Sequence, residues 1–133
     1  DEMQAGLLRV GMAHMEEITE EKRRIAEKYT EGIKNPMIRL PRIREGADSV
    51  WHQYVIRCTE RERLIEYLNE RKIGTIIHYP IPPHLSEAYK YLGFQKGDFP
   101  ITETYADEVL SLPIYNGITE EEQEYVINAL NNF

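Results

Sequence analysis

The stretch VWHQYVIRCTERERLIEYLNERKIGTIIHYP, residues 50–80, decides the fold class because its pattern is that of a strand, a helix and a second strand. Residues 50–57 are mostly β-branched or aromatic, which predicts a strand with one face formed by Val50, His52, Tyr54 and Ile56. Thr59 followed by Glu62 has the spacing of a capping box, and Gly74 is placed as a C-cap glycine. A helix is therefore predicted between them.

The apolar run over residues 75–79, which contains Ile76 and Ile77, predicts the second strand. This strand ends at a stiff corner that is rich in proline. Because side chains alternate along a strand, Ile76 and His78 share one face and the residues between them share the other. We expect both isoleucines to pack inside, whereas the terminal residues His78 and Tyr79 reach the rim of a cleft.

The N-terminal part of the chain is predicted to be one long helix over residues 1–34, because it lacks proline and its apolar residues recur at helical spacing. Its first half is apolar on more than one side, through Met3, Leu7, Leu8, Val10, Met12 and Met15. Such a helix either lies across its own sheet or connects to a large catalytic domain outside this sequence. The second interpretation is favoured, since a helix of ~45 Å exceeds what this domain needs. The chain then divides into a connecting helix, residues 1–35, and a C-terminal small domain, residues 36–133.

The C-terminal small domain adds one short strand and three helices to the central pattern. The strand is expected over residues 37–40, a short helix over 88–92, and a longer one over 100–110. Thr119 with Glu122 forms a second capping box and opens the closing helix, whose buried positions are Val126, Ile127 and Leu130. This order predicts an α+β fold with a small, mainly antiparallel sheet covered by helices.

Composition excludes several classes of function. The formal net charge is -7, and a negative field disfavours binding to nucleic acid through a basic face. No apolar run approaches the ~18 residues that a membrane-spanning helix requires. The single cysteine, Cys58, has no partner for an internal disulfide and no zinc-type spacing around it. It is interpreted as structural, in a reducing compartment, and a cytoplasmic location is expected.

The chain offers no catalytic motif of its own. Its eight glycines are not spaced as a P-loop or a dinucleotide fingerprint. All six lysines, at positions 22, 28, 34, 72, 90 and 96, have polar neighbours, whereas a Schiff-base lysine needs a desolvated pocket. We therefore expect no catalytic residue and no bound cofactor in this chain alone.

The stretch GTIIHYPIPPHLSEAY, residues 74–89, carries the candidate site. It concentrates His78, Tyr79 and His84 at the end of the predicted strand, across three prolines. Their spacing matches no zinc pattern, so no metal site is predicted. Prolines stiffen the loop, and the imidazole and phenol groups offer hydrogen bonds and flat faces, so recognition of a polar ligand is favoured. His52, by contrast, is interpreted as a half-buried strand histidine.

The corner, together with FPITETYADEVLSLPIYNGITEEEQEYVINAL at residues 99–130, closely resembles the C-terminal segment of the DegT/StrS-type sugar aminotransferases. The opening DEMQAGLLRV resembles the helix by which that family leaves its large domain, and VWHQYVIR resembles its first long small-domain strand. The resemblance covers essentially the whole chain.

The resemblance implies a fold-type-I, pyridoxal-phosphate-dependent homodimer that aminates nucleotide-linked keto-sugars. The cofactor lysine would lie in the large domain, so the isolated chain is expected to be inactive. His78 and Tyr79 match the family's pair that contacts the sugar, and His84 matches the histidine beyond the proline turn. The form of the corner resembles members that act on 3-keto-hexoses carried by thymidine or uridine diphosphate, with glutamate as amino donor.

Two alternatives stay open at this point. The chain is either a free-standing small-molecule-binding or regulatory module without a catalytic role, or a fragment of an enzyme. The first predicts a specific ligand of the isolated domain. The second predicts an apolar patch where the large domain would sit, and hence self-association of the fragment.

Overall fold

A computed structural model describes all 133 residues and contains one three-stranded sheet. The strands are β1 (Ile38–Arg39), β2 (Tyr54–Cys58) and β3 (Val109–Leu112), in the order β1-β2-β3. Both pairings are antiparallel, with Ile38 opposite Cys58 and Ile56 opposite Leu110. The α+β class and the antiparallel sheet predicted from the sequence are therefore confirmed.

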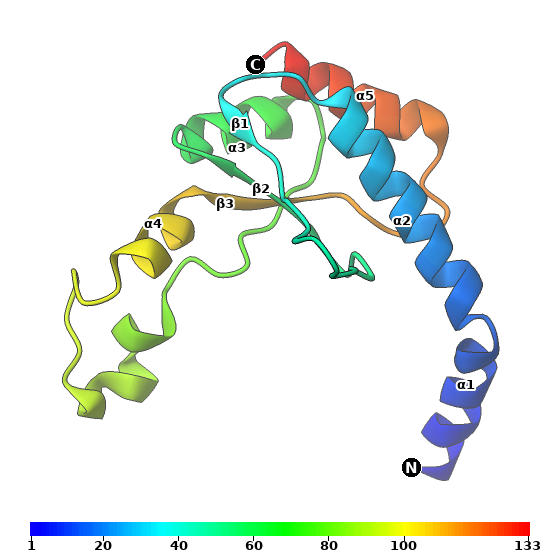
Figure 1. Cartoon of the computed structure of the whole chain (residues 1–133), viewed down its shortest axis with the longest axis horizontal. Coiled ribbons are helices and arrows are strands. Elements are labelled where there is room, and N and C mark those ends of the chain that lie inside the picture. Colours follow the sequence, from blue (N-terminus) through cyan, green and yellow to red (C-terminus); the bar gives the residue numbers. More distant parts are fainter.

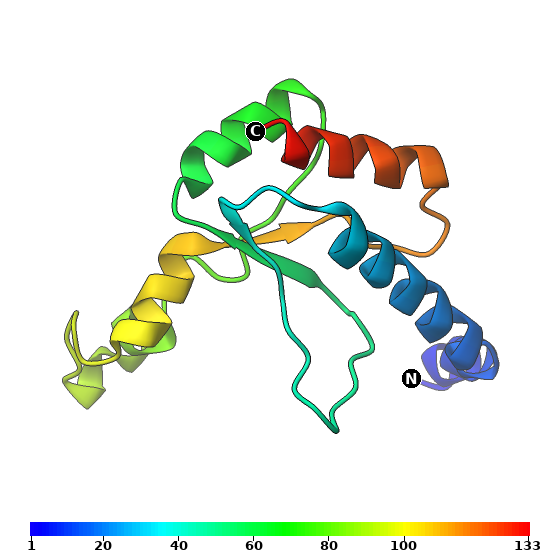
Figure 2. The same cartoon turned by 45° about the horizontal axis from the view of Figure 1, so that its top comes forward.

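Three helices cover one face of this sheet: α2 (Met15–Gly32), α3 (Arg61–Glu70) and α5 (Glu120–Asn131) (Figure 1). Alternate residues of β2 point toward them, so that Tyr54, Ile56 and Cys58 are buried while the residues between are half-exposed. Eighteen buried residues form a single apolar core. The opposite face of the sheet carries no helix layer, and the long β1–β2 loop extends from that side (Figure 2).

The crossing of α2 and α5 is close at one point. A Cβ atom placed on Gly32 would lie 2.8 Å from Cδ1 of Ile127 and 3.0 Å from its Cγ2. The absence of a side chain at position 32 is therefore what lets Ile127 pack against the end of α2. The Tyr29 hydroxyl, one turn earlier, donates a hydrogen bond to the Pro113 carbonyl oxygen at 2.8 Å.

The predicted strand over 50–57 begins four residues late. Val50 and His52 are exposed in the β1–β2 loop and do not share the buried face of β2. Trp51, from the same loop, folds back so that its ring centroid lies 5.4 Å from that of Tyr54. Residues 50–53 have no neighbouring strand to pair with, so they do not extend β2. Among them Trp51 still contacts the core, through the ring of Tyr54.

One of the two predicted capping boxes is confirmed and the other is wrong. The Thr119 hydroxyl accepts from the Glu122 amide, and the Glu122 carboxylate accepts from the Thr119 amide. At α3 the N-cap is Glu60 and no side chain caps the helix. The Glu62 carboxylate there accepts two hydrogen bonds from the guanidinium of Arg61 instead, which draws it away from the backbone.

The helix predicted over 100–110 ends earlier than expected. Helix α4 covers Pro100–Glu108, and Val109 takes extended backbone angles that begin β3. All four residues of β3 are buried, because this strand pairs with β2 on one side and meets the core. The sequence analysis missed this strand.

The strand predicted over 75–79 is also wrong as a regular element. Only one β-bridge forms there, between Ile76 and Ser111, with amide-to-carbonyl distances of 3.3 and 2.8 Å. Ile76 is 61% exposed, against expectation, whereas Ile77 packs against the core. The chain leaves β3 after this single bridge, so the face alternation expected of a strand does not hold.

Two short 3-10 helices follow the prolines, at Pro83–Leu85 and Glu87–Leu92, and the second replaces the predicted short helix over 88–92. With α4 they form an extension that leaves the sheet (Figure 1). We call residues 80–108 the arm.

The single N-terminal helix predicted over residues 1–34 is interrupted. Helix α1 (Glu2–Ala13) stops before α2, and His14 between them has φ -112° and ψ 11°, outside the helical range. Gly11 weakens the helix just before this break. No residue of α1 is buried, so the five predicted apolar positions that it contains are all exposed, as is the sixth, Met15, at the start of α2. None of the helices is both long enough and apolar enough to cross a membrane.

Candidate functional site

His78 is fixed at the end of the bridge to β3. Its Nδ1 lies 2.9 Å from the hydroxyl oxygen of Ser111, which is itself buried. The His78–Tyr79 peptide bond is cis, and the two rings meet edge to face with centroids 5.5 Å apart. One imidazole nitrogen is therefore anchored in the protein, and the ring stays half-buried with its other nitrogen free for a further hydrogen bond.

Tyr79 extends from the same position and is 73% exposed. With His78 it lines a pocket of about 530 Å³ between the corner and α4, whose other lining residues include Pro82, Tyr89, Tyr105 and Ala106. His78 also lines a second pocket of about 460 Å³, together with His52 and Ser111. The structure thus brings two of the predicted site residues together, with His78 between two cavities.

His84 lies apart from this pair and packs against α4. Its Nε2 is 3.1 Å from Oε1 of Glu103, and the two side chains are only 8% and 12% exposed. The His84 ring centroid is also 4.8 Å from that of Phe99. It does not line the pocket of His78 and Tyr79. The structure therefore gives His84 the surroundings of a residue that holds the corner in place.

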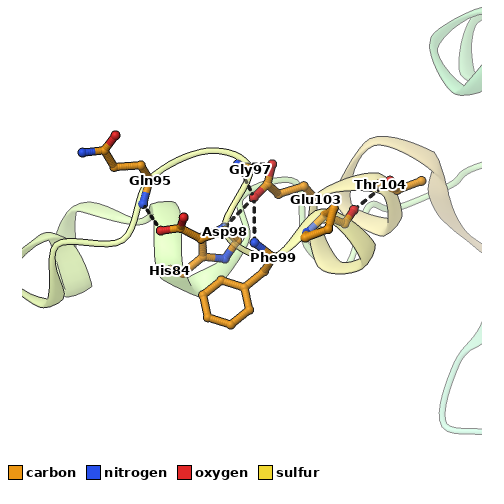
Figure 3. Close-up of polar contacts among 8 residues, drawn as sticks. His84, Gln95, Gly97, Asp98, Phe99, Glu103 and Thr104 are labelled. Carbon is orange, nitrogen blue, oxygen red and sulfur yellow. Dashed lines mark hydrogen bonds and ion pairs between the residues drawn. The ribbon is translucent and has the colours of Figure 1, made fainter.

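Glu103 is the centre of this group and was missed in the sequence analysis (Figure 3). Its carboxylate accepts from the Gly97 amide at 2.8 and 2.9 Å and from the Phe99 amide at 3.3 Å, in addition to its contact with His84. The Gly97 bond above all, followed by the His84 contact and the Phe99 amide, lowers the pKa of this carboxyl. An acidic residue in the first turn after Pro100 was the available signal.

The chain lacks the side-chain groupings that a metal ion or a covalently bound pyridoxal phosphate requires. No group of three or more His, Cys, Asp or Glu side chains is placed to hold a metal ion. None of the six lysines is buried; Lys28 contacts Glu124 at 3.3 Å and Lys90 contacts Glu87 at 3.6 Å. A lysine that binds pyridoxal phosphate needs a desolvated pocket, so the lysines of this chain do not fit that group.

Solved structures of known proteins share this fold over nearly the whole chain. The structure of S. venezuelae DesV in complex with a ketimine intermediate matches with a TM-score of 0.96 and 37% identity, over 99% of this chain and 36% of that one. Spr1654 of Streptococcus pneumoniae, described as a putative sugar aminotransferase and solved in its PLP form, matches with a TM-score of 0.81 and 25% identity, over 92% of this chain and 33% of that one.

The sequence itself matches the DegT/DnrJ/EryC1/StrS aminotransferase family over residues 1–131, and the chain belongs to that family. A curated relative from Aneurinibacillus thermoaerophilus, dTDP-3-amino-3,6-dideoxy-alpha-D-galactopyranose transaminase, is 43% identical over 133 residues. The alignment covers 100% of this chain and 36% of the relative, so the chain spans about a third of the relative's length.

Proposed function

We propose that this chain is the small domain of a pyridoxal-phosphate-dependent aminotransferase that acts on a nucleotide-linked keto-sugar. The observation that carries the proposal is the pair of His78 and Tyr79, which faces an open pocket while Ser111 anchors the histidine at 2.9 Å. Family membership supports the aminotransferase class. Residues outside this chain would hold the cofactor, and a residue outside this chain would also move the proton.

The role proposed for the corner is positioning of the sugar. The free imidazole nitrogen and the phenol of Tyr79 can hydrogen-bond the sugar hydroxyls and so orient the keto carbon. The hydrogen bond between His78 and Ser111 and the edge-to-face contact with Tyr79 restrict the rotation of the rings, which reduces the ordering cost when substrate binds.

The finer substrate assignment rests on the relatives. The name of the A. thermoaerophilus relative specifies a dTDP-linked sugar with its amino group at carbon 3. We propose the same class here, a dTDP- or UDP-linked 3-keto-hexose with glutamate as amino donor. The prediction that His84 contacts the substrate stays a prediction, and direct contact would require its ring to leave Glu103.

The test compares two half-reactions in the full-length enzyme. His78→Ala and Tyr79→Phe should each slow amination of the nucleotide-sugar, with about 1–3 kcal/mol lost per hydrogen bond. Release of the amino group from glutamate should be unchanged. Tyr91→Phe is the matched control, because Tyr91 is exposed on the arm but lies outside the pocket. Equal losses in all three variants, or losses in both half-reactions, would refute the assignment.

The isolated chain is proposed to be inactive and to self-associate through α1. Inactivity follows from the surroundings of its lysines, and borohydride reduction after incubation with pyridoxal phosphate should modify no single lysine stoichiometrically.

Self-association follows from the exposed apolar side chains of α1, which lack any contact with the core. Sedimentation should show a dimer that Leu7→Glu with Leu8→Glu dissociates; a monomer at high concentration, with α1 ordered, would contradict this expectation.

A further inference from the structure

A further pocket lies beside the sheet, at the end where Arg39, Arg57 and Val109 are neighbours on the three strands. It encloses about 850 Å³ and is lined by residues of β1, β2 and the start of β3, by residues 40–42 after β1, by Tyr105 of α4 and by Thr30 of α2. Val55 and Arg57, which line it, alternate along β2 with the buried residues Tyr54 and Ile56. The pocket therefore borders the sheet face that the helices leave uncovered, and it also reaches Thr30 of α2.

The charge of this pocket is unusual for a chain with a net charge of -7. Three arginines line it, Arg39, Arg42 and Arg57, and no aspartate or glutamate does. Arg57 is already neutralised: its Nε and Nη2 donate to one carboxylate oxygen of Glu108 at 3.0 and 2.7 Å. Its guanidinium carbon also lies 3.9 Å from the ring centroid of Tyr105.

Arg39 and Arg42 have no such partner. No carboxylate lies within 4.0 Å of either guanidinium, and neither side chain makes a hydrogen bond within the chain. Acidic residues outnumber basic ones by 23 to 16, so intramolecular partners are abundant elsewhere on the surface. Two arginines without a partner in the chain thus line one cavity, together with the apolar residues Leu40 and Val55.

Guanidinium groups recognise phosphate oxygens through paired N–H donors, and two of them suit a group with several anionic oxygens. The pocket is also adjacent to the sugar site, because Tyr105 and Val109 line both cavities. We propose that Arg39 and Arg42 form a binding site for a phosphate or diphosphate group. Resting on the proposed function, we assign this group to the diphosphate of the nucleotide-sugar whose hexose lies at His78 and Tyr79.

The first experiment tests the site without reference to any enzymatic activity. The 133-residue chain is titrated with inorganic pyrophosphate, inorganic phosphate and dTDP, while the amide resonances of residues 38–42 and 55–57 are followed by NMR. Saturable shifts are expected, with tighter binding of pyrophosphate than of phosphate. The double variant Arg39→Ala/Arg42→Ala should weaken binding by at least about tenfold, as expected when two charge-assisted contacts are lost.

Arg44→Ala is the matched control, because Arg44 is an exposed, unpaired arginine of the same loop that does not line the pocket. Its affinity for pyrophosphate should equal that of the unaltered chain. Absence of saturable shifts at roughly 10 mM pyrophosphate, which corresponds to negligible affinity, would overturn the site. An equal loss in Arg44→Ala would also overturn it, since it would show diffuse attraction rather than a built pocket.

The second experiment separates the site from the proposed function. In the full-length enzyme, Arg39→Ala/Arg42→Ala should raise KM for the nucleotide-sugar and leave the glutamate half-reaction unchanged. If pyrophosphate binds the chain but KM is unaffected, the anion site stands and its assignment to the nucleotide-sugar is overturned. If His78→Ala has no effect while the arginine variant does, the sugar-site proposal fails and the anion site survives.

Discussion

The helix-covered layer and the arm are held together in different ways. In the first, large side chains such as Tyr29, Leu64 and Leu130 are completely buried in one apolar core. In the arm, residues 80–108, most large apolar side chains are exposed, among them Tyr91 and Ile101. The layer is stabilised by apolar burial, whereas the arm depends largely on polar contacts, chiefly those of the Glu103 carboxylate and the Arg57–Glu108 ion pair.

This difference separates stability from recognition. The pocket of His78 and Tyr79 lies where the two regions meet, so one wall belongs to the rigid layer and the other to the arm. Regions with little buried apolar surface open at low free energy, and binding elements are commonly drawn from them. The arm is therefore the region whose position a ligand or a neighbouring domain can most easily change.

The largest effect should come from the core of the layer. Leu130→Ala removes a completely buried side chain and should lower the free energy of unfolding by about 2–5 kcal/mol, because it leaves a cavity among packed helices. Leu92→Ala, the same change at an exposed position of the arm, should cost less than about 0.5 kcal/mol. Urea denaturation followed by circular dichroism measures both. Similar losses in the two variants would break the comparison.

An intermediate effect should come from the start of α5. Thr119→Ala removes the hydroxyl that accepts from the Glu122 amide, and it should destabilise the layer by about 1 kcal/mol. Thr59→Ala provides a matched control, because Thr59 precedes α3 but caps nothing. Thermal melting should therefore move in the first variant alone. A comparable shift in Thr59→Ala would mean that the α3 terminus is capped in solution.

The smallest effect on global unfolding should come from the arm, where pH acts locally. The pKa of Glu103 is lowered in the folded chain. The stability that its carboxylate contributes to the arm is therefore present above the unfolded pKa of about 4.3, and it is lost as the pH falls through the folded pKa. In that pH window the chemical shifts of the Gly97 and Phe99 amides should move toward the values of solvent-exposed amides, while those of the α5 amides stay unchanged.

Glu103→Gln is the control for this titration, since an amide at that position does not titrate in the same range. The arm resonances of this variant should show no transition in the acidic window. If the core and the arm of the unaltered chain instead change together, the two regions form one cooperative unit and the comparison fails.

Sequence patterns predicted the layer well where a local signal and a tertiary partner coincided. The capping box at Thr119 and the strand residues from Tyr54 onward are examples, because their side chains alternate between core and surface. Val109–Leu112 was missed because all four residues are buried and no turn signal separates them from α4. For residues 75–79 a strand was predicted from the composition, but the only pairing partner in the fold is Ser111, so a single bridge forms.

The candidate site shows the same limit. His78 and Tyr79 could be found because polar aromatic side chains after an apolar run are conspicuous. Glu103 and Arg42 look like ordinary surface charges in the sequence, and only folding shows that one gathers three donors while the other lines a pocket without a counter-charge. Long-range pairing of charges leaves no periodic trace along the chain.

The contact between Gly32 and Ile127 lies at the C-terminal end of α2, so a small change there can be magnified at the other end of the helix. Helix α2 has 18 residues, so at the usual rise its N-terminal end lies ~27 Å from Gly32. A methyl group at position 32 would lie 2.8 Å from Cδ1 of Ile127, so either the Ile127 side chain must rotate or the helix must shift. A tilt of only about 5° would carry the far end of the helix through ~2 Å, given that length. The close packing that glycine permits at position 32 thus bears on the position of residues five turns away, at the other end of α2.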